Sequence, residues 1–188
     1  FPYTPLFRSV RASQFVQAEA FKYFIESFRC RKWKKTGILW WNVADSWPQF
    51  SDAVVDYYYE KKLAYHYIRN SQLPIQLILD ETDAGDLKLY AVNDTCDAVS
   101  GNFRVTDVLT DEILISGTFH AGADLSVEIA EKTVNPQKRA MFLIEWNVGV
   151  ETHFNHYLHG PIPFELGMYE KAFSLLAPKL YPEFTWRM

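Results

Sequence analysis

The sequence has few of the features that mark membrane, disulfide-rich or nucleic-acid-binding proteins. No apolar run approaches the roughly 18 residues of a membrane span, and the N-terminus lacks the charged and apolar regions of a signal peptide. The two cysteines, Cys30 and Cys96, have no CxxC or Cys/His spacing, which disfavours a disulfide scaffold and a zinc site. The formal net charge of -4 gives no basic footprint for nucleic acid. We therefore expect neither a membrane nor a nucleic acid as partner.

A starting methionine is also missing, so we expect the chain to be cut from a longer protein, and its compartment is not indicated. What is present argues for a folded protein: 48% of the 188 residues are hydrophobic, 16% are aromatic, and six are tryptophan. A chain of this length holds one medium domain, or a small domain plus a fragment of another.

The first 72 residues are predicted to contain two helices. The first runs from an N-cap at Ser13 to about Arg31, and the second covers Lys61 to Asn70. The apolar residues of the first helix recur at helical spacing; they are Phe21, Phe24, Ile25 and Phe28. Its charged residues are expected to face water; they are Glu19, Lys22, Glu26 and Arg29. Such an aromatic face needs a sheet, another helix or a second copy of the chain to cover it.

Between the two helices lies a short apolar, aromatic run from Gly37 to Trp41, typical of a buried strand. Asn42 and Asp45 follow it directly, and Trp47 comes next. Aromatic faces and hydrogen-bonding groups just past the carboxyl end of a buried strand are what a sugar site at the top of a parallel barrel needs. The alternative is that these tryptophans are core residues, which composition alone favours.

From Leu73 the chain changes to short strand-like segments separated by turn signals. Seven are predicted: Ile75–Leu79, Asp86–Val92, Gly101–Leu109, Ile113–Phe119, Ala123–Ala130, Ala140–Asn147 and Thr152–Leu158. Their number and spacing indicate an immunoglobulin-like β-sandwich without the paired cysteines of antibody domains. A connector and a short helix from Leu166 to Ala177 follow the sandwich.

Four motifs, taken together, resemble the end of the catalytic barrel in glycoside hydrolase family 2, in its β-mannosidase-like branch. They are Gln14–Phe21, Gly37–Asn42 with Asp45–Pro48, Val55–Tyr58, and Lys62–Tyr67. The resemblance implies an α+β fragment: the last strand and helices of a (β/α)8 barrel in residues 1–72, an immunoglobulin-like β-sandwich in residues 73–160, and a tail with a short helix in residues 161–188.

The resemblance also assigns roles. Residues 37–41 would form the last barrel strand, Trp41 would line the subsite for the terminal sugar, and Asn42, Asp45 and Trp47 would help to shape that pocket. Among these, Asp45 is the best candidate for a structural or hydroxyl-binding carboxylate. The chain departs from the family at Tyr59, where a glycine is usual after the Asp-Tyr-Tyr motif, so the turn there is expected to differ.

Members of this family are similar in using two glutamates in a retaining mechanism, with carboxyl groups about 5 Å apart. One usually follows an asparagine and the other a serine, and this chain contains no Asn-Glu and no Ser-Glu dipeptide. No catalytic residue, metal or cofactor is therefore expected here. The implied function is one wall of the sugar pocket of a retaining exo-glycosidase that acts on terminal β-linked sugars of an oligosaccharide or glycan. The partner would be the remainder of the barrel, and the isolated piece would be inactive.

A different class of function stays open: a non-catalytic carbohydrate-binding or structural β-sandwich module. The sandwich aromatics are scattered, which is more typical of core than of a sugar platform; they are Phe103, Phe119, Trp146 and Phe154. One histidine-rich strand, with His153, Asn155, His156 and His159, lacks an Asp, Glu or Cys at matching spacing, so a metal site is not the expected interpretation.

Overall fold

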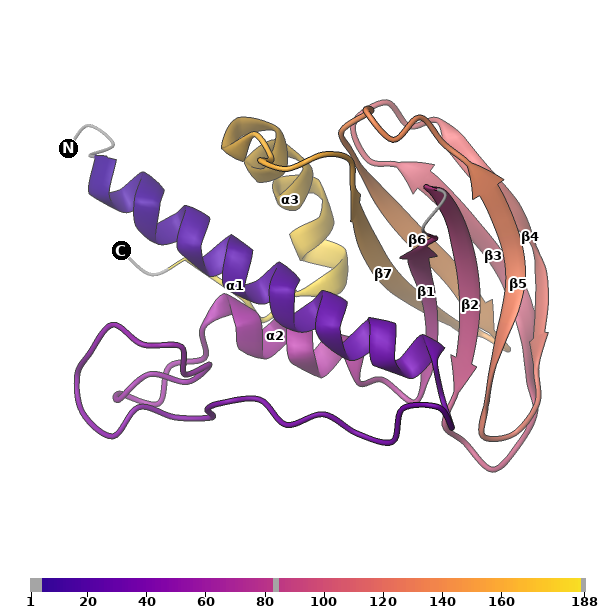
Figure 1. The fold of residues 1–188 in the computed structure, drawn as a ribbon, viewed down its shortest axis with the longest axis horizontal. Helices are drawn as coiled ribbons and strands as arrows, with labels where there is room; N and C mark the ends of the chain where they lie inside the picture. Colours follow the sequence, from indigo (N-terminus) through magenta and orange to yellow (C-terminus); the bar gives the residue numbers. More distant parts are fainter. Residues whose placement is uncertain (1–4, 83–84, 187–188) are drawn as a thin grey trace.

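The computed structural model describes residues 5–82 and 85–186, and it consists of three helices and seven strands (Figure 1). The helices are α1 (Pro5–Cys30), α2 (Leu63–Ser71) and α3 (Leu166–Leu180). The strands are β1 (Ile75–Glu81), β2 (Asp86–Asn93), β3 (Val99–Asp107), β4 (Ile113–Ala121), β5 (Leu125–Thr133), β6 (Ala140–Val148) and β7 (Glu151–His159). No helix in the described part of the chain is long and apolar enough to cross a membrane.

The strands form the predicted β-sandwich, with antiparallel sheets in the orders β1-β2-β5 and β4-β3-β6-β7. Alternate residues point inward because successive side chains of a strand face opposite sides of its sheet. The resulting core contains Leu77, Leu89, Val105 and Ile144. It also contains three of the four sandwich aromatics predicted to be core, Phe103, Phe119 and Trp146. The fourth, Phe154, is only partly buried and packs against the helical core instead. The alternation in the sequence therefore located these strands correctly.

A second core joins the three helices to the outer side of the β6–β7 pair. Phe15 of α1, Tyr67 of α2 and Phe173 of α3 meet in it, together with Met141 of β6. The C-terminal tail, which has no predicted element, completes this core: the Trp186 ring lies 5.5 Å from that of Phe15. The helices are thus gathered on one side of the sandwich (Figure 1).

The predicted start of the first helix is wrong. Helix α1 begins at Pro5, which is favourable in a first turn because its missing N–H would have no partner there. Ser13 lies inside the helix, where its hydroxyl donates to the carbonyl of Val10 at 2.9 Å instead of capping. The predicted end is confirmed, since α1 stops at Cys30.

The prediction that the charged residues of α1 face water is also wrong. The side chains of Glu19 and Arg29 are only 19% and 13% exposed, and the other two residues are more deeply buried. Lys22 and Glu26 are only 3% and 4% exposed. The reason is that α1 packs on two sides at once, against α2 and against the sandwich. On the sandwich side Asn155 of β7 donates to the carboxylate of Glu26 at 3.0 Å, so the buried charges have partners.

The predicted strand at residues 37–41 does not form. These residues have no regular structure, and Leu39 and Trp41 are 99% and 78% exposed. A strand requires a neighbour for its backbone hydrogen bonds, and a single barrel strand has none within this chain. The second predicted helix is confirmed as α2, which starts at Leu63.

Candidate functional site

The predicted site residues lie on the connection between α1 and α2, residues 36–62, which we call the wall segment (Figure 1). Its middle is ordered by a few backbone hydrogen bonds. The Val55 amide donates to the Val43 carbonyl at 2.8 Å, the Asp45 amide to the Val55 carbonyl at 3.1 Å, and the Lys62 amide to the Val54 carbonyl at 2.9 Å. Residues 42–45 are thereby held against residues 54–55, and residues 46–53 form the loop between them.

Asp45 fixes that loop from inside. One of its carboxylate oxygens accepts hydrogen bonds from the Ser51 hydroxyl and from the Gln49 amide at 3.0 Å, and the other accepts one from the Lys62 ammonium at 3.2 Å. The side chain is only 1% exposed. The bond from Ser51, aided by Gln49 and Lys62 and opposed by burial, holds the pKa of Asp45 below its ordinary value. Both oxygens are therefore engaged within the wall segment.

Trp41 and Trp47 present exposed aromatic surfaces, 78% and 60% accessible. Neither makes a ring contact with another aromatic residue in the described part of the chain. Between them Asn42 is anchored by its carbonyl, which accepts from the Val54 amide at 3.3 Å, and the Trp41–Asn42 peptide bond is cis. The side-chain Oδ1 of Asn42 is covered and accepts no hydrogen bond from a described residue. An orphaned acceptor of this kind is uncommon in a complete structure.

The exposed apolar surface of the wall segment extends beyond the tryptophans. Leu39 is 99%, Val43 60% and Phe50 100% exposed. Exposed apolar residues that gather into a patch usually mark an interaction site. The wall segment thus presents an aromatic, apolar surface that fits a partner or a ligand.

The turn after the wall loop keeps a conformation that suits glycine. Tyr59 has a φ of 64°, in the left-handed region, although its side chain is large. The turn is closed by Asp56, whose carboxylate accepts from the amides of Tyr58 at 2.8 Å and Glu60 at 2.9 Å. At this position the chain therefore holds a tyrosine in a glycine-like backbone.

Sequence reasoning missed a buried polar cluster at the junction of α1, β7 and α3. Glu19 accepts a hydrogen bond from the Tyr169 hydroxyl, and its carboxylate lies 2.8 Å from His156 Nε2. Tyr169 and Tyr67 share a hydrogen bond of 2.8 Å between their hydroxyls. Burial alone would raise the pKa of Glu19, but His156 and Lys22 outweigh it and hold that pKa below its ordinary value.

A signal for this cluster exists in the sequence. Phe15, Glu19, Lys22 and Glu26 follow one another at helical spacing, so a row of charges continues the row begun by a core aromatic. The histidine-rich strand serves packing and hydrogen bonding: the His153 ring stacks on Trp146 at 5.5 Å. In residues 5–82 and 85–186 no group of three His, Cys, Asp or Glu residues is placed to hold a metal ion.

Comparisons with known proteins identify the fold. No protein-family model and no curated protein matches the chain. Among solved structures, the fold is similar to that of β-D-mannosidase from Dictyoglomus thermophilum, with a TM-score of 0.67 and 24% identity. It is also similar to an exo-chitosanase from Amycolatopsis orientalis, with a TM-score of 0.61 and 18% identity. Each comparison covers 79% of this chain and 19% of the other, so the chain spans about a fifth of those proteins.

These structural similarities show that the chain has the fold of one part of a β-glycosidase. More particularly, the resemblance to the β-mannosidase-like branch of glycoside hydrolase family 2, predicted from the motifs, is confirmed at the level of the fold by the β-D-mannosidase structure.

Proposed function

We propose that this chain is the barrel end and following sandwich of a retaining, β-mannosidase-like exo-glycosidase, and that the wall segment forms one side of its sugar pocket. The observation that carries the proposal is the exposure of Trp41, at 78%, within a wall segment that is otherwise held in place by hydrogen bonds. An exposed indole face covers the CH face of a sugar, and neighbouring amides and hydroxyls provide its hydrogen bonds.

Each site residue then has a role that fits its geometry. Trp41 contacts the sugar, and Trp47 lies at the rim. The orphaned Oδ1 of Asn42 accepts a hydrogen bond from a sugar hydroxyl or from the remainder of the barrel, which removes the cost of a buried, unpaired acceptor. Asp45 acts through the loop rather than on the sugar, because Ser51 and Lys62 already occupy its oxygens.

Residues 1–72 support the catalytic site but do not supply its catalytic groups. A retaining glycosidase needs an acid and a nucleophile on either side of the scissile bond. Glu26 is paired with Lys22, and Glu19 is bonded to His156 and Tyr169, away from the wall segment. We therefore assign both catalytic glutamates to the remainder of the barrel, with residues 73–160 as a structural sandwich and residues 161–188 as the tail that joins it to the helices.

Kinetics of the parent enzyme test the pocket wall. Trp41→Ala should lower kcat/KM for an aryl β-mannoside by about thirtyfold, since a central aromatic contact contributes roughly 2 kcal/mol. Trp33→Ala is the matched control, because Trp33 is also exposed, at 68%, but lies beyond the end of α1. Equal losses in the two variants, or no loss in Trp41→Ala, would contradict the assignment.

A second experiment uses the isolated 188-residue chain. It should show no turnover of the same mannoside, because neither catalytic glutamate is present. Calorimetry with manno-oligosaccharides distinguishes the other class of function: micromolar affinity in the isolated chain would identify a carbohydrate-binding module instead. The buried positions of Phe103, Phe119 and Trp146 favour the absence of such affinity.

A further inference from the structure

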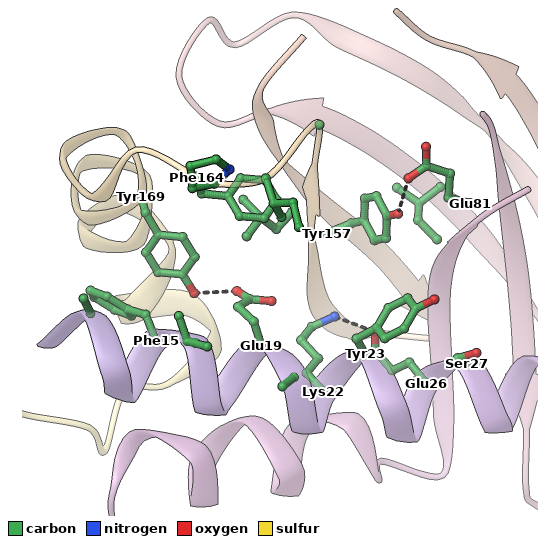
Figure 2. A pocket seen from close by; sticks show the side chains of 18 of the residues that line it. Phe15, Glu19, Lys22, Tyr23, Glu26, Ser27, Glu81, Tyr157, Phe164 and Tyr169 are labelled. Atoms are coloured by element: carbon green, nitrogen blue, oxygen red, sulfur yellow. Dashed lines mark hydrogen bonds and ion pairs between the residues drawn. The ribbon is translucent and has the colours of Figure 1, made fainter. Parts of the chain in front are cut away.

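A groove of about 610 Å³ lies between α1, β7 and the connection from β7 to α3, and its buried charges already have partners (Figure 2). Figure 2 shows the Tyr169 hydroxyl directed at Glu19, and Glu26 is paired with Lys22. Exposed aromatic groups lie instead in a turn of the wall segment, residues 56–60, which we call the tyrosine turn.

The tyrosine turn carries three consecutive tyrosines on its surface. Tyr57, Tyr58 and Tyr59 are 44%, 70% and 85% exposed. The rings of Tyr57 and Tyr58 meet edge to face, with 5.3 Å between their centroids, whereas the ring of Tyr59 contacts no other aromatic ring of the described residues. Tyrosine combines a flat apolar ring with a polar hydroxyl, and a sugar offers CH faces and hydroxyls to both. The turn thus presents a surface suited to a sugar.

The backbone of the tyrosine turn is closed by hydrogen bonds around Asp56. The Asp56 amide donates to the Glu60 carbonyl at 2.9 Å, and the Asp56 carbonyl accepts from the Tyr59 amide at 3.0 Å. The Asp56 carboxylate accepts from the amides of Tyr58 and Glu60 at 2.8 and 2.9 Å. A surface that is held in this way loses little conformational freedom when a ligand binds.

Tyr59 keeps its exposed ring at a cost in folding free energy. Its φ of 64° lies in the left-handed region, which glycine adopts freely and an L-residue does not. The ring gains little packing in return, because most of it faces solvent. Strained backbone of this kind is concentrated at functional sites, where it is part of how a ligand is bound. The conformation therefore points to a ligand for Tyr59.

The tyrosine turn lies at the same end of the wall segment as Trp47. Ala44 and Val55 pair as parallel neighbours, and the Asp45 amide donates to the Val55 carbonyl. Both chains of a parallel pair run in one direction, so the residues that follow each partner lie at the same end. Trp47 follows Ala44 and the tyrosine turn follows Val55, whereas Trp41 precedes the pair. A glycan whose terminal sugar contacts Trp41 would therefore pass Trp47 before it reaches the tyrosine turn.

We propose that the tyrosine turn is an outer subsite of the sugar pocket, in which the Tyr59 ring stacks on the second sugar of a β-linked oligosaccharide. The proposal rests on the proposed function and extends it to the part of the substrate beyond the terminal sugar. In an exo-glycosidase this second sugar belongs to the leaving group. The tyrosine turn thus favours a glycan, which reaches Tyr59, over a small leaving group, which does not.

The parent enzyme tests the subsite with two substrates that share the terminal sugar. β-Linked mannobiose places a second sugar at Tyr59, and methyl β-mannoside has only a methyl group in its place. Tyr59→Gly should lower kcat/KM for mannobiose about fivefold, as expected for one exposed ring contact, and leave methyl β-mannoside unchanged. Glycine suits the observed φ, so this variant removes the ring and keeps the turn. An equal change for both substrates, or no change, would overturn the proposal.

Two further variants show whether the ring and its place matter. Tyr59→Phe keeps the ring and should retain the wild-type kcat/KM for both substrates. Tyr23→Ala is the matched control, because Tyr23 is also exposed, at 62%, but lies on α1. It should leave both substrates unchanged. A loss for mannobiose in Tyr59→Phe as large as in Tyr59→Gly, or the same selective loss in Tyr23→Ala, would overturn the stacking role of Tyr59.

Thermal unfolding of the parent distinguishes a sugar from a protein partner at Tyr59. If the remainder of the barrel covered the ring, Tyr59→Gly would lower the melting temperature, and this result would overturn the proposal. We expect no decrease, since the variant relieves the strained backbone.

The same two substrates separate this inference from the proposed function. Trp41→Ala should lower kcat/KM for both, because each carries the terminal sugar. An effective Trp41→Ala without a selective loss in Tyr59→Gly would remove the outer subsite and leave the proposed function standing. An ineffective Trp41→Ala with the selective loss in Tyr59→Gly would remove the pocket wall at Trp41 and keep the outer subsite.

Discussion

Tyr59 is held in a backbone conformation that L-residues other than asparagine and aspartate rarely adopt. Its φ of 64° is imposed by the turn, in which the Tyr59 amide donates to the Asp56 carbonyl at 3.0 Å and the Asp56 amide donates to the Glu60 carbonyl at 2.9 Å. The Tyr59 side chain is 85% exposed and returns little packing energy. The left-handed conformation costs an L-residue roughly 1–2 kcal/mol of folding free energy, and a glycine at this position would avoid that cost.

Tyr59→Gly should therefore raise the free energy of unfolding by about 0.5 kcal/mol. The gain is smaller than the full conformational cost because glycine also makes the unfolded chain more flexible, by roughly 0.4–1 kcal/mol. Urea unfolding with an unchanged m-value measures it. Tyr58→Gly is the control: Tyr58 is exposed too, at 70%, but its φ is not positive, so this variant should gain nothing. A loss of stability in Tyr59→Gly would show that its ring matters in the turn.

The sequence pointed to Asp45 as a candidate site residue but did not indicate which groups it contacts. Asp45 was predicted as a structural or hydroxyl-binding carboxylate, and the sequence left the choice open. The partners that occupy it, Ser51 and Lys62, are six and seventeen residues away, and only the closed loop brings them to the carboxylate. Long-range closure of this kind leaves no periodic trace in a sequence.

Helix α1 is attached to the sandwich by buried charges as well as by apolar packing. Lys22 and Glu26 form an ion pair whose side chains are 4% and 5% exposed. Asn155 of β7 links this pair to β1, because its amide donates to Glu26 at 3.0 Å and to the Leu77 carbonyl at 2.9 Å. A buried pair of this kind compensates its own desolvation while both partners are present, and it becomes costly when one is removed.

Glu26→Ala should accordingly destabilise the protein by about 3 kcal/mol, since the ammonium of Lys22 would stay buried without its carboxylate. The double variant Lys22→Met, Glu26→Leu removes both charges with similar volume and should cost markedly less than Glu26→Ala. Chemical denaturation of the wild type, of the single variants Lys22→Met and Glu26→Leu, and of the double variant gives the coupling energy, which should exceed about 1 kcal/mol. Additive single costs would mean that the two charges do not depend on each other.

Helices and strands were predicted accurately where the elements they pack against or pair with lie in this chain. The seven strands and α2 were predicted almost to their ends, because the partners of each strand lie within the same sandwich and impose a period of two on the sequence. The strand at residues 37–41 was predicted from the same kind of apolar run but has no neighbour in this chain. The polar row of α1 was misassigned because helical periodicity shows which residues share a face and not what covers that face.

At the scale of the whole molecule, the chain covers most of its apolar surface by itself. The sandwich has one core, and the helices share another with β6, α3 and the tail. Arg29 and Lys32 add ion pairs to Asp94, so the end of α1 is bound to the loop after β2. The expectation that the first helix needs cover is thus met largely by the sandwich and by α3. The wall segment nevertheless keeps several large apolar side chains exposed, among them Leu39 and Phe50.

Limited proteolysis with chymotrypsin should therefore cut the isolated chain first within residues 36–62. Leu39 and Phe50 are 99% and 100% exposed there, in backbone held by few hydrogen bonds, whereas Phe103 and Trp146 are buried in paired strands. Because α1 stays joined to the sandwich by the shared core and the ion pairs of Arg29, the two cleaved parts should elute together in gel filtration. In the parent the same segment should resist cleavage, since the remainder of the barrel would cover it. Mass spectrometry of the early products decides: a first cut in the sandwich, or equal cleavage rates in the isolated chain and the parent, would show that the wall segment has no missing partner.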